Sequence, residues 1–86
     1  MIHLVLFSRP GCHLCDEMKA VVEAVAREIP LVLEQVDISG SPELERRYGK
    51  QIPVLALDGR TIAVARVTEA TLRRVIEERS RREVQG

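Results

Sequence analysis

Two cysteines, Cys12 and Cys15, are the residues of this 86-residue chain whose type and spacing suit redox chemistry. A short apolar run, Ile2 to Phe7, precedes them and a helical pattern begins at Leu14, so the pair lies at a strand-to-helix junction. The unpaired N–H groups and the macrodipole of a helix N-terminus favour negative charge, and the thiolate is the reactive form of cysteine. We therefore expect Cys12 to act as the nucleophile and Cys15 to resolve a mixed disulfide formed on Cys12.

Two basic side chains lie close to Cys12 in the sequence. Arg9 lies three residues before Cys12, and His13 follows it directly. A cation beside a thiolate stabilises it, so either residue could tune Cys12, and Arg9 could also attract a substrate carboxylate. Each could equally be an exposed loop residue without electrostatic consequence. Asp16 would have the opposite effect, because its negative charge lies one turn past Cys12 and disfavours a thiolate there.

Metal binding is the alternative use of the two cysteines. A structural zinc site needs four ligands, and only His3 and His13 remain as nitrogen donors. We therefore expect no metal and no bound cofactor in a single chain. The alternative function is a non-enzymatic binding module in which Cys12 and Cys15 ligate a metal or an iron–sulfur cluster between two chains.

Composition narrows the class of protein. Hydrophobic residues make up 45% of the chain and charged residues 30%, with a formal net charge of zero, so neither nucleic acid nor an anionic membrane is an expected partner. No apolar run approaches the ~18 residues of a membrane helix, and the N-terminus lacks the features of a signal peptide. We expect a monomer in the cytoplasm. In that compartment paired cysteines are more often catalytic or metal-binding than structural.

The remaining pattern predicts the elements that hold the cysteines. Apolar periodicity and turn signals predict strands over 2–7, 31–37, 52–57 and 61–65 and helices over 14–29, over 42–48 and from 69 onward. A helix joins the first two strands, so they are expected to be parallel. The order β-α-β-(α)-β-β-α indicates an α/β fold, a three-layer α/β/α sandwich around a four-stranded mixed sheet. The first strand is apolar apart from His3, which predicts an interior strand covered on both faces.

Local signals mark the element ends. Ser41, followed by a proline, is expected to cap the short helix, and Gly49 to end it. Asp58-Gly59 predicts a hairpin turn, and Thr68 can cap the last helix. Beyond residue 77 the chain is mostly charged, so we expect that helix to fray into solvent. The domain is assigned to residues 1–79 and a charged C-terminal tail to residues 80–86.

The chain resembles the thioredoxin superfamily and looks most like its glutaredoxin-like branch of small proteins. The likeness extends to about Ile76. It rests on these matching segments: Arg9-Pro10-Gly11-Cys12-His13-Leu14-Cys15-Asp16, Val36-Asp37-Ile38, Pro42-Glu43-Leu44, Tyr48-Gly49 and Ile52-Pro53-Val54.

The resemblance implies roles for residues outside the cysteine pair. Pro53 would be cis and pack beside the active-site disulfide, and the backbone of Ile52 would face Cys12 and pair with an extended substrate segment. Arg9 matches a basic residue that glutaredoxins place near the glutathione carboxylate or the thiolate. Glutaredoxins carry a glycine pair and an Asp after their fourth strand, where this chain has 65–69, Ala-Arg-Val-Thr-Glu.

These observations predict a small thiol–disulfide oxidoreductase, similar to glutaredoxins. Cys12 and Cys15 would carry catalysis, and Arg9, His13, Ile52 and Pro53 would contact the substrate. The expected partners are disulfide-containing proteins or small thiols. A reducing system, either glutathione or another low-molecular-weight thiol or a flavoprotein reductase, would restore the dithiol.

Overall fold

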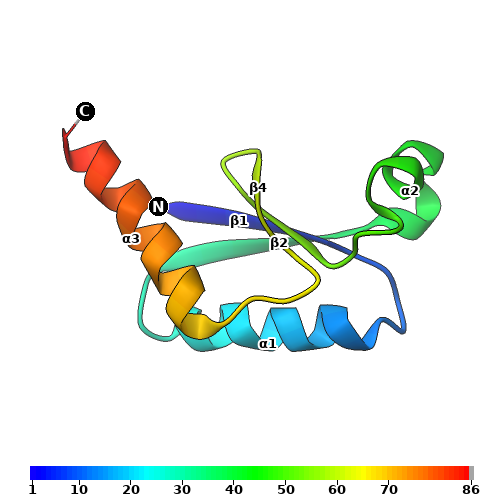
Figure 1. The fold of residues 1–86 in the computed structure, drawn as a ribbon, viewed down its shortest axis with the longest axis horizontal. Helices are drawn as coiled ribbons and strands as arrows, with labels where there is room; N and C mark the ends of the chain where they lie inside the picture. Colours follow the sequence, from blue (N-terminus) through cyan, green and yellow to red (C-terminus); the bar gives the residue numbers. More distant parts are fainter. Residues whose placement is uncertain (86) are drawn as a thin grey trace.

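The computed structural model describes residues 1–85, which form a single four-stranded sheet with helices on both faces (Figure 1). The elements, in chain order, are β1 (Ile2–Ser8), α1 (His13–Ala26), β2 (Leu31–Asp37), the 3-10 helix η1 (Ile38–Gly40), α2 (Pro42–Tyr48), β3 (Val54–Leu57), β4 (Arg60–Val64) and α3 (Glu69–Gln85). This is the α/β thioredoxin-like fold that the sequence predicts.

The sheet is mixed, with the strand order β2-β1-β3-β4. β1 and β2 are parallel from the Ile2–Leu31 pair onward, as a crossover helix requires. β3 runs antiparallel to both β1 and β4. Consequently the end of β1, the start of β3 and the end of β4 meet at one edge of the sheet, where the register aligns Phe7 with Val54 and Val54 with Val64.

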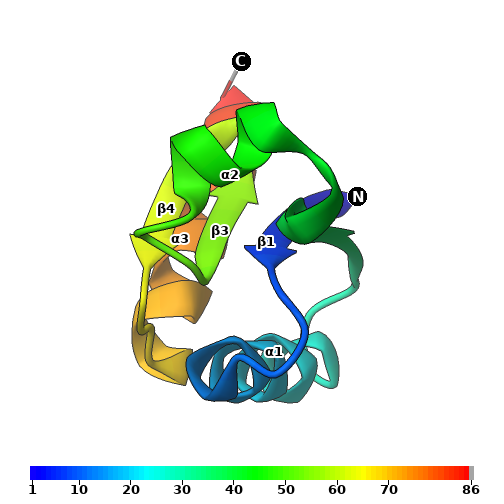
Figure 2. The same ribbon diagram turned by 90° about the vertical axis from the view of Figure 1, so that its right-hand side faces the viewer.

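One face of the sheet carries the core. The alternate residues of β1 on this face are buried against apolar side chains of α1 and α3. The cluster comprises Ile2, Leu4, Leu6, Met18, Val22, Val25, Leu55, Leu57, Leu72 and Ile76. α1 and α3 therefore share one layer, and Figure 2 shows α2 on the opposite side of the strands.

The other face of β1 is covered less than predicted. His3 is exposed and Val5 is half-buried, so the expectation that β1 is covered on both faces is wrong for its first half. The reason is the shortness of α2, which reaches only the end of the strand, where Tyr48 stacks on Phe7 with ring centroids 4.2 Å apart.

The predicted helix caps and the hairpin turn are present. The side chain of Ser41 accepts a hydrogen bond from the N–H of Leu44 and caps α2, and Thr68 caps α3 in the same way. Asp58 and Gly59 have φ of 52° and 79° in the turn between β3 and β4, the left-handed pair that a tight hairpin needs.

Two helix ends differ from simple expectation. Gly49 follows α2 as predicted, but its φ is −55°, so it does not adopt the left-handed conformation typical of a glycine cap. α3 continues as helix to Gln85, so the expected fraying beyond residue 77 is wrong. The division into a domain of residues 1–79 and a tail of residues 80–86 stays a prediction. Within residues 1–85, no helix is long and apolar enough to cross a membrane.

Candidate active site

Three loops meet at the edge of the sheet where β1 ends. They are the β1–α1 loop with Cys12, the segment Ile52-Pro53 before β3, and the residues after β4 that begin with Ala65. In Figure 2 these loops all lie toward the viewer, in front of the strands. The arrangement follows from the strand directions, because β3 starts, and β1 and β4 end, at the same edge.

Cys12 and Cys15 form a disulfide at the N-terminus of α1, with their Cα atoms 5.2 Å apart. Cys12 is the N-cap residue, and its sulfur accepts a hydrogen bond from the N–H of Cys15 at 3.2 Å. The helix N-terminus thus supplies both an N–H donor and the positive end of its dipole to the sulfur of Cys12. In the reduced protein the same groups favour a thiolate there.

The two sulfur-bearing residues differ in accessibility. Cys15 is 4% exposed and joins the buried residues, whereas Cys12 is only half-buried. An attacking substrate or thiol therefore meets Cys12 first. On its other side Cys15 borders a crevice of about 260 Å³ whose wall includes Asp16, Lys19 and Asp37.

The Ile52-Pro53 peptide bond is cis, as the resemblance implies, and Pro53 is fully buried. The N–H of Ile52 donates to the carbonyl of Tyr48 at 3.1 Å, and the carbonyl of Pro53 accepts from the N–H of Ala65 at 2.8 Å. Among residues 1–85, no backbone N–H donates to the carbonyl of Ile52. That carbonyl is the group of Ile52 that remains for pairing with a substrate segment.

The loop after β4 takes the place of the glycine pair found in glutaredoxins. Ala65 has a φ of 69°, and the N–H of Arg66 donates to the carbonyl of Val64 at 2.8 Å, so Ala65 is the centre of a γ-turn. The N–H groups of Ala65 and Arg66 both have partners within the chain. Neither is free to bind the γ-glutamyl carboxylate of glutathione in this conformation.

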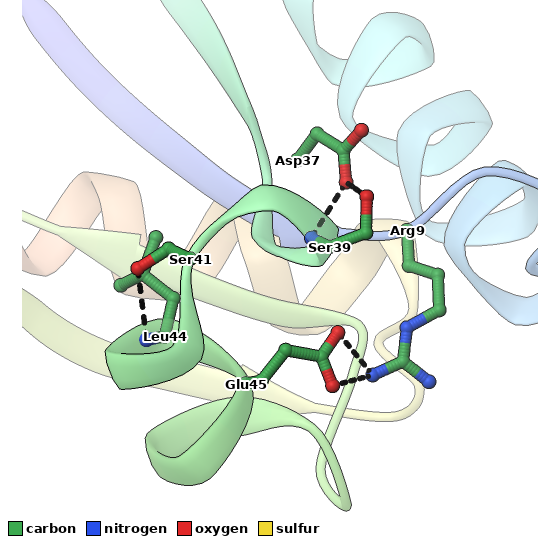
Figure 3. A network of polar contacts seen from close by, with 6 residues as sticks. All are labelled: Arg9, Asp37, Ser39, Ser41, Leu44 and Glu45. Carbon is green, nitrogen blue, oxygen red and sulfur yellow. Dashed lines mark hydrogen bonds and ion pairs between the residues drawn. The ribbon is translucent and has the colours of Figure 1, made fainter.

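Arg9 pairs with a residue that the sequence did not associate with the site. One of its terminal nitrogens lies 2.7 Å from each carboxylate oxygen of Glu45 on α2 (Figure 3). The contact joins the β1–α1 loop to α2 across 36 positions of sequence. Near it, the hydroxyl and the N–H of Ser39 bind the carboxylate of Asp37 and hold the pKa of that carboxyl below its usual value. A role for Arg9 in binding substrate stays a prediction.

Each histidine lies beside a glutamate. The side chain of His13 is 90% exposed and lies 3.4 Å from a carboxylate oxygen of Glu17 one turn along α1. His3 lies near the start of β1, at the opposite end of the strand, 3.2 Å from Glu34. Within the described part of the chain, no group of three or more His, Cys, Asp and Glu residues is placed to hold a metal ion. The effect of His13 on Cys12 stays a prediction.

The sequence did not identify Glu45 or Glu17 as neighbours of the site. It also did not identify Val21, which lines a groove between α1 and the end of β4. Glu45 could not be paired with Arg9 without knowing how α2 packs on the loop. The sequence did contain a signal for Val21. Together with Met18 and Val22 it forms an apolar stripe on α1 that is wider than the two buried residues alone.

Comparisons with known proteins agree with this geometry. The profile of the glutaredoxin-like domain family (DUF836) matches residues 3–77. A thioredoxin of Methanocaldococcus jannaschii is 28% identical over 81 residues, which cover 91% of this chain and 95% of the relative. The X-ray structure of a structural genomics target from X. campestris superposes with a TM-score of 0.75 at 32% identity, over 87% of this chain and 96% of that one. A mutant thioredoxin from Halobacterium salinarum superposes with a TM-score of 0.60 at 26% identity, over 90% of this chain and 73% of that one.

Proposed function

Because this chain belongs to the glutaredoxin-like domain family and carries a Cys-x-x-Cys disulfide, we propose that it is a thiol–disulfide oxidoreductase of disulfide-containing proteins or small thiols. Cys12 is the attacking residue and Cys15 the resolving residue. The observation that carries this proposal is the unequal exposure of two bonded cysteines at a helix N-terminus. A buried structural disulfide would not need its first sulfur at the N-cap.

The reaction proceeds by two exchanges. The Cys12 thiolate attacks one sulfur of the substrate disulfide, forms a mixed disulfide and expels the other substrate sulfur as a thiolate. Cys15, as thiolate, then attacks the sulfur of Cys12 and releases the second substrate thiolate. The substrate gains two electrons, and the protein loses two as the Cys12–Cys15 disulfide forms. The helix N-terminus stabilises the charge on Cys12 in the reduced form and when it leaves during reduction.

A second thiol system must restore the dithiol. We keep two candidates, a low-molecular-weight thiol such as glutathione and a flavoprotein reductase. The engaged N–H groups of Ala65 and Arg66 remove two donors that would hold a γ-glutamyl end. Glutathione would therefore depend on other contacts, such as the Ile52 carbonyl or Arg9. A monomer in the cytoplasm, where thiols are kept reduced, is the setting in which this cycle runs toward substrate reduction.

Trapping the intermediate tests the assignment of roles. The Cys15→Ser variant, mixed with the disulfide of glutathione and 2-nitro-5-thiobenzoate, should retain a glutathione adduct on Cys12, because no resolving sulfur remains. Intact mass and peptide mapping identify the adduct. The matched Cys12→Ser variant keeps only the buried Cys15 and should form little adduct on the same timescale. Equal labelling of both variants, or none in either, would contradict the proposed roles.

A further inference from the structure

A groove of about 420 Å³ lies between α1 and the end of β4. Its apolar lining includes Met18 and Val21 of α1, Ile62 of β4 and Val67 of the following loop. Glu17 and Arg66 supply charged groups to its wall. We call this hollow the α1–β4 groove; its size lies in the range of clefts that bind small molecules or side chains.

Two residues of the groove wall contact residues of the redox site. Ala65 is part of its wall, and the N–H of Ala65 donates to the carbonyl of Pro53. Glu17, also in the wall, contacts His13, which lies between the two cysteines. The groove therefore lies beside the place where a substrate segment would contact Cys12 and Pro53.

The length of α1 between Cys12 and Val21 gives the distance from the reacting sulfur to the groove. Glu17 is five residues and Val21 nine residues beyond Cys12, so the groove lies about 8 to 14 Å along α1 from the reacting sulfur at 1.5 Å per residue. An extended peptide advances about 3.3 Å per residue. A side chain that enters the groove thus belongs to a residue about two to four positions from the substrate's reacting cysteine.

The lining identifies the kind of side chain. Val21, Ile62 and Val67 are each half-buried although they lie next to the fully buried Met18. Covering these apolar groups removes them from water, whereas a carboxylate seated among them would have to lose its hydration. We propose, on the basis of the proposed oxidoreductase function, that the α1–β4 groove binds a bulky apolar side chain two to four residues from the reacting cysteine of a protein disulfide. The favoured substrates are protein segments rather than glutathione disulfides.

The test uses peptides that carry one cysteine linked by a disulfide to 2-nitro-5-thiobenzoate. The aromatic thiol is the better leaving group, so Cys12 takes the peptide sulfur and releases the coloured thiol. Four peptides are identical except for Leu or Ser placed three residues before or three residues after the cysteine. Stopped-flow absorbance with the reduced native protein gives each second-order rate constant.

On at least one side of the cysteine, the Leu peptide should react about tenfold faster than its Ser partner, which is about 1.4 kcal/mol. The Val21→Lys variant, which puts an amine in the groove, should lose this preference. Ala20→Lys adds the same charge at the neighbouring exposed position of α1 and should keep the preference.

Equal rates for all four peptides with the native protein would overturn the groove proposal, as would a preference that survives in a folded Val21→Lys variant. The native comparison needs no variant, so misfolding of Val21→Lys leaves the proposal falsifiable. If no peptide and no glutathione reporter releases the coloured thiol, the proposed oxidoreductase function itself fails. Reaction of all of them without preference contradicts the groove proposal alone.

Discussion

Replacing Arg9 with Met and Glu45 with Gln, singly and together, measures how strongly the active-site loop is held to α2. Both substitutions keep the shape of most of the side chain and remove its charge. In the structure one guanidinium nitrogen lies 2.7 Å from each carboxylate oxygen, and each side chain is 38% exposed. The pair is therefore neither buried nor fully in water.

The expected coupling free energy is about 1 kcal/mol. Opposite charges at 4 Å attract by about 1 kcal/mol in water and about 4 kcal/mol at an effective dielectric constant of 20. Desolvation and side-chain ordering offset much of the larger figure, and exposed pairs contribute about 0.2 to 1 kcal/mol in double-mutant cycles. For a domain of this size, 1 kcal/mol shifts Tm by about 4 to 8 °C.

The cycle is measured by urea unfolding at low ionic strength and again near 1 M salt. Each single variant should lose about 1 kcal/mol of unfolding free energy, the double variant should lose no more than either, and the coupling should shrink at high salt. A coupling within about 0.3 kcal/mol of zero would refute the reasoning that this contact fastens the loop.

The same variants separate a structural role of Arg9 from substrate binding. If Arg9 acts through Glu45, both single variants change the rate of reduction of the glutathione reporter to the same extent. If Arg9 binds a substrate carboxylate, Arg9→Met alone slows that reporter and leaves a cysteamine reporter, which has no carboxylate, unchanged. The first pattern would indicate a structural role for Arg9, and the second would support the substrate-binding role implied by the family resemblance.

Two further predictions concern stability. Gly49→Ala places a Cβ against the backbone carbonyl oxygen of Glu45 and should lower the free energy of unfolding by about 1 to 3 kcal/mol. The control variant Gly40→Ala, whose Cβ meets open space, should not lower Tm. Equal Tm values for the Gly49→Ala and Gly40→Ala variants would contradict this account. Asp58 accepts a hydrogen bond from Arg79 that holds its pKa below the usual value, so its stabilising contribution is present above about pH 3.9 and is lost as pH falls through the lowered folded pKa. Urea unfolding across this acid range should therefore show a smaller loss of stability for Asp58→Asn, which tolerates the turn conformation, than for the native chain; parallel losses would exclude the effect.

The parts of the fold that depend on neighbouring residues could be predicted from the sequence. Cys12 caps α1 and Asp58-Gly59 forms the hairpin turn because each depends on a few adjacent backbone groups. The parallel pairing of β1 and β2 follows from the crossover helix. The position of the cysteines at the edge of the sheet follows from these facts together.

The parts of the fold that depend on packing between distant segments could not be predicted from the sequence. Arg9 meets Glu45 only because α2 folds over the β1–α1 loop. His3 is exposed because α2 stops short of it, although the apolar run around it predicted cover. Gly49 ends α2, but it is needed for close approach to the carbonyl of Glu45 rather than for a left-handed turn.

The most direct test of the redox assignment is equilibration of the native protein against glutathione redox buffers, followed by acid quenching and intact-mass analysis. A single two-electron transition between the dithiol and the Cys12–Cys15 disulfide is the predicted result, and its midpoint gives the potential. A glutathione adduct that accumulates along the transition would support glutathione as the reductant. If neither the disulfide nor an adduct forms at any buffer ratio, the chain is not a thiol–disulfide oxidoreductase, and metal content of the purified protein would then decide for a binding module.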